Sequence, residues 1–344
     1  MHIKNTKLGV KLHVKNIKSR AKHWFFPENK IKYRYKRKSD NMERFKRKID
    51  AYLLEWKESK YKMPLIVSGA RQIGKTNAIR NFGTQNYKYF IEINFIEENF
   101  YKDIFDEGYK VDNILKRILY HSPLLNYEPG ETLIFFDEIQ KCPNCATSLK
   151  FFREDGRFDV ICSGSLMGLN YKEIESNSVG NKTDYIMRSM DFEEFLVNID
   201  KRQLVDFIKE SYVNNTPMPF HQMALDLYND YLILGGYPEV IDAYINKRDY
   251  LTIESIKQKI INLIKSETIY ARNLIDISRT NEVLDSLPFQ LLKENKKFQY
   301  GNIKKGSRSK DYEASIQFLG INSLIHRSFK LNDIKSPLSS YKDI

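Results

Sequence analysis

The chain has 344 residues, of which 42% are hydrophobic and 13% aromatic, so it is long enough for about two domains with apolar cores. Its net charge is +12, but residues 1–40 hold thirteen basic and two acidic side chains, whereas the remainder holds 43 basic and 42 acidic ones. The excess charge therefore belongs to an N-terminal arm, and the charge alone does not mark the globular part as a nucleic-acid-binding protein.

Membrane and secreted classes are also disfavoured. No apolar run approaches the roughly 18 to 20 residues that a membrane span needs. The first residues are basic and polar, without the apolar stretch of a secretory signal. Three cysteines are too few for a disulfide framework. We therefore expect a cytoplasmic protein that does not contact a membrane.

From Met42 onward the hydrophobic pattern changes from irregular to periodic. Residues 1–41 are rich in Lys, Asn and His and are predicted to form a basic, disordered arm. Apolar residues then recur at spacings of three and four, which predicts a helix whose buried face holds Phe45, Ile49, Leu53 and Trp56.

Short apolar strands alternate with helices in the next part of the chain. The strands are predicted at 63–69, 87–95, 131–138, 158–165 and 184–190, and the helices between them at 76–83, 111–121 and 145–155. Gly83 and Gly156 are expected to follow the end of the first and last of these helices. The alternation predicts an α/β fold with a parallel sheet, and the chain beyond about residue 200 is predicted to be mainly helical.

The stretch GARQIGKT lies between the first predicted strand and the first predicted helix of this sheet. Its spacing, Gly69-x4-Gly74-Lys75-Thr76, matches a P-loop, in which glycines let backbone N–H groups wrap around phosphate oxygens. Lys75 is predicted to reach the β- and γ-phosphates of ATP, and Thr76 to ligate Mg²⁺. The predicted nucleotide contacts of this P-loop NTPase core are Gly69, Ala70, Arg71, Gln72, Ile73, Gly74, Lys75, Thr76 and Asn77.

Two acidic residues end the third predicted strand. Asp137 is predicted to hold Mg²⁺, directly or through water, and Glu138 to polarise the attacking water, so that Lys75 and Glu138 are the predicted catalytic residues. Two acids after a core strand are otherwise an ordinary surface feature, and it is the P-loop that favours the functional interpretation. The strand between the loop and the acids indicates the branch of P-loop proteins in which a glutamate activates water.

The fourth predicted strand ends in CSGS. A polar side chain at this position is a candidate sensor of the γ-phosphate, and the sequence leaves open whether Ser163 or Ser165 has that role. A turn of small residues at a strand end is the alternative.

The order of these motifs resembles a large prokaryotic family of ATPases, in which an AAA+-type domain precedes a C-terminal domain of unknown function. The resemblance covers about residue 42 to the end. It rests on the strings RKIDAYLLEWKES, GARQIGKT, FIEINF, FFDEIQKCP, LKFFRED, SGSLMG, DFEEFL, YLILGGYPEVIDAY and SLPFQLLKENKKFQYGNIKKGSRSKDYEASIQFLGINSLI. The resemblance implies an ATP site at Gly69–Thr76, Asp137 and Glu138, and it carries over neither a client nor a biological role.

Pattern and resemblance together predict four regions. These are the arm over 1–41, a P-loop ATPase domain over 42–190, a helical lid over 191–280 and a partial winged-helix module over 281–344. GGYPEV is expected to pack the lid, its glycines allowing a close helix–loop contact. Because similar proteins continue for another domain-sized stretch, we expect a truncated member, and an ATP-binding remnant without productive activity is one alternative function.

A second alternative is a DNA-binding protein gated by nucleotide. Its DNA contacts would come from the basic arm or from residues 296–310, and its winged helix from the order helix, short element, helix and the strand-like LIHRSFKL. The basic residues of the second segment are Lys296, Lys297, Lys304, Lys305, Arg308 and Lys310.

The sequence also contains candidate arginine fingers and one C-x-x-C motif. AAA+ proteins commonly complete the site with an arginine from a neighbouring subunit, which leaves a homo-oligomer open, with Arg71, Arg153, Arg157 and Arg188 as candidates. Cys142 and Cys145 form a C-x-x-C, but no further ligands stand at a zinc spacing, so packing cysteines beside a helix start at Pro143 are preferred.

Overall fold

Five parallel strands form the centre of the fold, in the order β2-β3-β4-β1-β5. The structure, a computed structural model, describes residues 45–165, 179–268, 276–294, 297–322 and 324–328. The predicted arm over 1–41, Lys296 and residues 329–344 lie outside the described residues. The strands are β1 (Leu65–Gly69), β2 (Tyr89–Asn94), β3 (Thr132–Asp137), β4 (Asp159–Ser165) and β5 (Thr183–Ile186).

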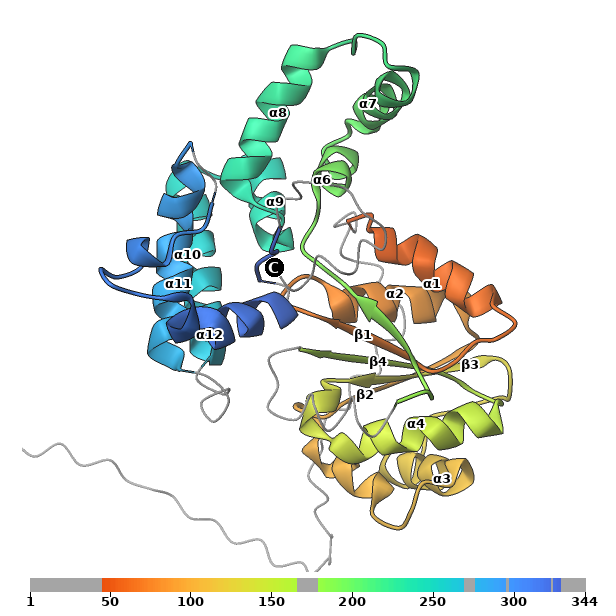
Figure 1. The fold of residues 1–344 in the computed structure, drawn as a ribbon. Coiled ribbons are helices and arrows are strands. Elements are labelled where there is room, and N and C mark those ends of the chain that lie inside the picture. Colours follow the sequence, from red (N-terminus) through yellow and green to blue (C-terminus); the bar gives the residue numbers. More distant parts are fainter. Residues whose placement is uncertain (1–44, 166–178, 269–275, 295–296, 323, 329–344) are drawn as a thin grey trace, which may run out of the picture. The chain divides into compact units, whose positions relative to one another are not determined.

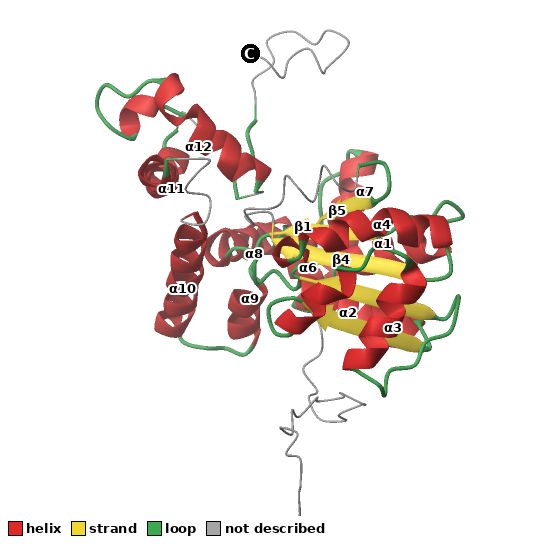
Figure 2. Cartoon of the chain, turned by 90° about the horizontal axis from the view of Figure 1, so that it is seen from below, coloured by secondary structure: helices red, strands yellow, loops and turns green. Residues whose placement is uncertain are grey.

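The sheet confirms the predicted α/β class and its strands, although each strand is shorter than predicted. β1 and β3 are buried along their whole length, as expected for strands covered on both faces. Because all five strands are parallel, their carboxyl ends lie along one edge of the sheet, where ligands of open α/β sheets bind. Figure 2 shows the strands as one continuous layer.

Helices cover both faces of the sheet (Figure 1). On one face lie α1 (Lys48–Glu58) and α2 (Lys75–Asn86), and on the other α3 (Val111–His121) and α4 (Pro143–Asp155). Short 3₁₀ turns, η1 (Asn99–Phe105) and η2 (Ile139–Lys141), precede α3 and α4. The predicted apolar face of α1 is confirmed for Ile49, Leu53 and Trp56, which share a core with α2 and β1. Phe45 was wrongly included, because α1 begins at Lys48 and Phe45 packs against the core of the helical region that follows the sheet.

One predicted helix end is wrong. Gly83 lies inside α2, which continues to Asn86, instead of ending it. A Cβ at Gly83 would lie 2.3 Å from Cδ2 of Phe90, so the glycine lets α2 approach β2 closely. Gly156 does follow α4, at φ 67°, as predicted.

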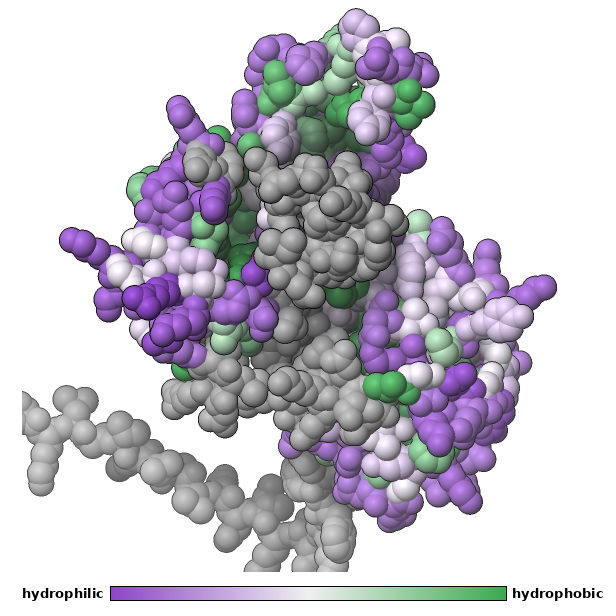
Figure 3. Space-filling model, in the orientation of Figure 1, coloured by the Kyte–Doolittle hydropathy of each residue, from purple (hydrophilic) through white to green (hydrophobic). Residues whose placement is uncertain are grey.

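A separate helical region follows the sheet. It comprises α6 (Phe192–Asn198), α7 (Arg202–Asn214), α8 (His221–Leu234), α9 (Pro238–Ile245) and α10 (Tyr250–Thr268), which share one apolar core. Several large apolar side chains of α8 lie outside that core, such as Leu232, which is 61% exposed. In Figure 3 apolar surface accordingly shows between polar side chains in the part formed by α7 and α8.

The last described elements are α11 (Ile277–Leu292), η4 (Tyr300–Asn302) and α12 (Ser309–Ile321). α11 and α12 pack through Val283, Tyr312, Ile316 and Leu319. Residues 324–328 form no strand, so the described part of the chain does not show the strand of a winged helix. No helix among the described residues is long and apolar enough to cross a membrane.

The segment after α8 touches the segment between β5 and α6. Met190 N donates to Gly236 O at 2.8 Å, and Tyr231 Oη donates to Met190 O at 2.9 Å. A Cβ at Gly236 would lie 2.0 Å from Met190 O and 2.9 Å from its carbonyl carbon and nitrogen. The predicted close contact at GGYPEV is therefore confirmed at Gly236, and it joins the helical region to the end of the sheet.

The substitution Gly236→Ala is expected to lower the free energy of unfolding by about 1 to 3 kcal/mol, because the added methyl group would overlap backbone atoms of Met190. Urea denaturation followed by circular dichroism measures the change. Gly320→Ala is the matched control, because Gly320 lies in α12 and a Cβ there would have no atom within 4 Å, and alanine favours the helix by up to about 1 kcal/mol. Equal unfolding midpoints for Gly236→Ala and the parent would contradict the close contact.

Candidate functional site

The predicted P-loop joins the carboxyl end of β1 to the first turn of α2. Gly69 has φ 152° and Gly74 has φ 96°, backbone conformations that favour glycine. A Cβ at Gly69 would also lie 2.2 Å from Met187 O, so the end of β5 leaves no room for a side chain. Because α2 begins at Lys75, its free N–H groups and the positive end of its dipole face the loop, which suits an anion.

The Lys75 side chain turns back over this loop. Its ammonium donates to Gly69 O at 3.0 Å and to Ala70 O at 2.7 Å, and the residue is 7% exposed. The loop thus holds one full positive charge at its centre, beside the N–H groups of α2. The lysine at this place of the P-loop pattern is the one that reaches the β- and γ-phosphates when a nucleotide is bound.

Asp137 is buried at the carboxyl end of β3, where four donors meet its carboxylate. Thr76 Oγ1 and Asn94 Nδ2 each donate to Oδ2 at 3.1 Å. Ser163 Oγ and the Glu138 N–H donate to Oδ1, the latter at 3.1 Å. The residue is 2% exposed, so these donors replace the water that a carboxylate otherwise needs.

Asn94 is a site residue that the sequence prediction missed. It is the last residue of β2 and stands in register with Asp137. Its Oδ1 accepts from the N–H groups of Ile96 at 2.9 Å and Glu97 at 3.1 Å, which fixes the amide with Nδ2 towards Asp137. One signal in the sequence could have found it: Asn94 is a polar residue near the end of the predicted strand that precedes the strand ending in Asp137.

The hydroxyl of Thr76 and the carboxylate of Asp137 fit a magnesium ion. Ligand oxygens at about 2.1 Å from Mg²⁺ in octahedral geometry lie about 3 Å apart when adjacent. Thr76 Oγ1 and Asp137 Oδ2 are 3.1 Å apart, and both are hard oxygen donors of the kind this ion prefers. The two predicted metal ligands therefore come together, although 61 residues separate them in the chain.

Glu138 follows in a left-handed backbone conformation with φ 59°, which is uncommon for a residue other than glycine. Gln140 Nε2 donates to its carboxylate and so orients it. A Cβ at Gly164 would lie 2.7 Å from Gln140 Oε1, so the glycine in CSGS makes room for this glutamine. Gln140 was not predicted, because nothing in the local sequence distinguishes it from a surface residue.

The two candidate serines occupy different places. Ser163 donates to Asp137, so its hydroxyl serves that carboxylate. Ser165 ends β4 in register with Gly69, the first residue of the loop, and is 3% exposed. Of the two, Ser165 is therefore the one that lies beside the phosphate loop.

A cavity of about 140 Å³ borders the loop at Ala70 and Ile73. Met187, Arg188 and Tyr237 are among the residues that line it further from the loop. Its wall thus combines apolar, aromatic and cationic side chains next to the predicted phosphate site.

The arginine candidates differ in their partners. Arg157 is bound to Asp155 and Asp112, and Arg153 donates to Gly180 O and Asn181. Of the four candidates, Arg71 lies in the loop itself and Arg188 lines the cavity.

The cysteines and the basic segment lie apart from the loop's contacts. All three thiols are buried, and Pro143 starts α4 as predicted. Among the described residues, no cluster of three or more His, Cys, Asp or Glu side chains could hold a metal ion. Lys297, Lys304, Lys305, Arg308 and Lys310 are exposed around η4 and the start of α12.

Two protein families match separate parts of the chain. Residues 61–196 match a family described as an AAA domain, and residues 225–341 match a domain of unknown function, DUF8612. No curated protein matches the chain.

Similar solved structures include the Walker-type ATPase paby2304 of Pyrococcus abyssi, with 16% identity, a TM-score of 0.49 and coverage of 82% of this chain and 90% of that chain. The DnaA structure from Aquifex aeolicus bound to AMPPCP has 12% identity, a TM-score of 0.33 and coverage of 80% and 87%. The ORC1 protein of Aeropyrum pernix in complex with DNA has 14% identity, a TM-score of 0.31 and coverage of 80% for both. The strand order and the family match, rather than these distant structures, define the fold class.

The buried thiols are expected to resist modification in the folded protein. Burial raises the pKa of Cys142 to about 11 and that of Cys145 well above its usual value, so the reactive thiolate is scarce at pH 8. Ellman's reagent at pH 8 should therefore release little colour from the native chain, and three equivalents in denaturant. Rapid reaction of one native thiol would show instead an accessible cysteine suited to redox or metal chemistry.

Proposed function

Because the chain belongs to the AAA-type P-loop ATPases with a domain of unknown function behind the AAA domain, we propose that it binds ATP with Mg²⁺ and hydrolyses it to ADP and phosphate. The observation that carries the proposal is the hydrogen bond between Thr76 and Asp137. It brings the Thr76 hydroxyl and the Asp137 carboxylate to the spacing that two adjacent ligands of one magnesium ion would have.

The proposed roles of the side chains follow from their positions. Bound Mg²⁺ would neutralise phosphate charge, held by Thr76 and Asp137. Lys75, released from the loop carbonyls, bonds the β- and γ-phosphate oxygens. Glu138 accepts a hydrogen bond from the attacking water, and the hydrogen bond from Gln140 fixes the orientation of the Glu138 carboxylate. Ser165 is the proposed γ-phosphate sensor, because it stands beside Gly69.

The cavity beside Ala70 and Ile73 is the proposed place of the nucleoside. It adjoins the loop, and Tyr237 in its wall offers an aromatic ring for a base. The remaining predicted contacts, Arg71, Gln72 and Asn77, belong to the loop and the first turn of α2 and are proposed to act through their backbone.

The four predicted regions are kept as a proposal. The helical core of α6 to α10 supports a lid over 191–280, attached at Gly236. A cytoplasmic ATPase that acts on a protein client, alone or as a homo-oligomer, is the function we propose. No observation in the described residues favours the DNA-binding alternative, since residues 324–328 add no strand to α11 and α12.

Lys75→Ala is expected to weaken ATP binding by about tenfold or more, because it removes a charged hydrogen-bond donor to phosphate. Isothermal titration calorimetry with Mg²⁺·ATP measures the dissociation constant. Lys116→Ala, which removes an exposed lysine from α3, should bind as the parent does. Unchanged affinity in Lys75→Ala would refute the loop assignment.

Glu138→Gln is expected to bind ATP normally and to lower its turnover by about 100-fold, because an amide is a poor base for the attacking water. Phosphate release under saturating ATP measures turnover, and Glu131→Gln at the other end of β3 is the isosteric control. Parental turnover in Glu138→Gln would exclude this role. A parent chain that binds ATP without hydrolysing it would support the ATP-binding remnant instead.

A further inference from the structure

Arg47 lies just before α1 and ahead of residues 61–196, which match the AAA domain. The first turn of α1 fixes its backbone, since Arg47 N donates to Asp50 Oδ2 at 2.9 Å and Asp50 N donates to Arg47 O at 3.0 Å. Its side chain is 6% exposed and leaves α1 in the direction of the phosphate loop. A buried guanidinium is costly unless acceptors surround its N–H groups.

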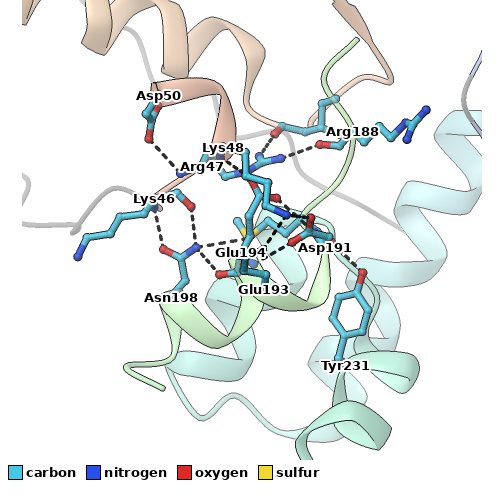
Figure 4. Close-up of polar contacts among 12 residues, drawn as sticks. Lys46, Arg47, Lys48, Asp50, Arg188, Asp191, Glu193, Glu194, Asn198 and Tyr231 are labelled. Atoms are coloured by element: carbon cyan, nitrogen blue, oxygen red, sulfur yellow. Dashed lines mark hydrogen bonds and ion pairs between the residues drawn. The ribbon is translucent and has the colours of Figure 1, made fainter. Parts of the chain in front are cut away.

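Three acceptors from two segments surround the guanidinium (Figure 4). Nη1 donates to the carbonyl of Ile73 at 2.7 Å, Nη2 to the carbonyl of Arg188 at 2.6 Å, and Nε to Glu194 Oε1 at 3.2 Å. Ile73 belongs to the phosphate loop, whereas Arg188 lies between β5 and α6 and Glu194 lies in the first turn of α6. One side chain thus holds these two segments against each other.

The bond to Ile73 bears on phosphate binding through the planarity of the peptide group. In a trans peptide, the carbonyl of one residue and the N–H of the next point in opposite directions. Fixing the Ile73 carbonyl outward, on Arg47, therefore directs the Gly74 N–H inward. Gly74 has φ 96° and no side chain, so its own conformational preference does not fix the orientation of this peptide.

Glu194 in turn fixes Arg47. Its Oε1 accepts from Arg47 Nε and from Lys48 N at 2.6 Å, and its Oε2 accepts from Asp191 N at 3.2 Å. With a side chain only 9% exposed, the carboxylate is held by the first turns of both α1 and α6 (Figure 4). The Arg47 guanidinium is consequently held by the Ile73 carbonyl on one side and by the Glu194 carboxylate on the other.

We propose that Arg47 is a positioning residue of the nucleotide site, which orients the Gly74 N–H towards phosphate by holding the Ile73 carbonyl. The inference rests on the proposed function and adds a residue to it that the P-loop pattern does not contain. Arg47 does not touch the nucleotide and acts through the loop backbone. The contacts with Arg188 and Glu194 make the same residue a link between the loop and the start of the helical region.

Lysine is not a substitute at this position. A guanidinium presents its N–H groups in a rigid planar fork, whereas an ammonium is a single point on a flexible stem. Three acceptors spread around the fork cannot all be reached from one nitrogen. Arg47→Lys therefore keeps a positive charge near the loop but lacks the planar set of donors. Comparing it with the parent distinguishes orientation of the loop backbone from simple electrostatic attraction of phosphate.

The test compares the binding of Mg²⁺·ATP and of inorganic tripolyphosphate, which probes the phosphate loop without the nucleoside. Calorimetry is performed on the parent, Arg47→Met, Arg47→Lys and the double variant Arg47→Met/Glu194→Gln, at a temperature where circular dichroism shows each one folded. The double variant removes the buried carboxylate charge that Arg47→Met alone leaves unpaired. Lys48→Met is the matched control, because the half-exposed side chain of Lys48 pairs with Asp191 and Glu193 and not with the loop.

All three Arg47 variants are expected to bind both ligands about tenfold more weakly, and the control to bind as the parent does. The double variant should stay weak although its unpaired charge is gone, which a purely structural role would not produce. Parental affinity in Arg47→Met or Arg47→Lys, or its recovery in the double variant, would overturn the inference. A parent chain that binds neither ligand would overturn the proposed function itself.

Discussion

A buried carboxylate sets the arrangement of the candidate site. Asp137 is 2% exposed, and a charge removed from water costs several kcal/mol unless donors replace the lost hydration. The donors come from α2, β2 and β4, through Thr76, Asn94 and Ser163. Shifting β2 or β4 by one residue would point Asn94 or Ser163 to the other face of the sheet. The register at the carboxyl edge and the satisfaction of Asp137 therefore depend on each other.

The short segment after β5 has a comparable role on the other side of the loop. Met187 O closes the space beside Gly69, the Arg188 carbonyl accepts from Arg47, and Met190 packs against Gly236. Three residues of one short segment thus contact the loop, the residue before α1 and the turn after α8. Each of these contacts is made by backbone atoms of the segment. The side chains of Met187 and Met190 are buried in the cores of the sheet and of the helical region, which fixes the path of the segment.

The sequence was sufficient for the sheet, the loop and the acidic pair, because each has a local pattern. Apolar runs indicated the strands, and glycine spacing indicated the loop. Asn94 and Arg47 escaped prediction, because their partners lie 43 and 26 residues away and only the fold defines the contact. Gly83 was misjudged for the same reason, since its neighbour Phe90 lies on β2 and helix patterns do not show it. The partner of Gln140 is only two residues away, but nothing in the local sequence distinguishes this glutamine from a surface residue.

The N–H groups and the carbonyl groups of the loop backbone require different hydrogen-bond partners. Its N–H groups are the part offered to phosphate, so its buried carbonyls must find other donors. Lys75 supplies them for Gly69 and Ala70, and Arg47 for Ile73. The Met187 N–H bonds the Ser68 carbonyl at 2.8 Å, and the Ala78 N–H bonds that of Gly74 at 3.0 Å. On the proposed binding of ATP, the carbonyls of Gly69 and Ala70 would lose Lys75 as their donor. The carbonyls of Ser68, Ile73 and Gly74 would keep theirs, so this part of the loop does not have to be ordered by the ligand.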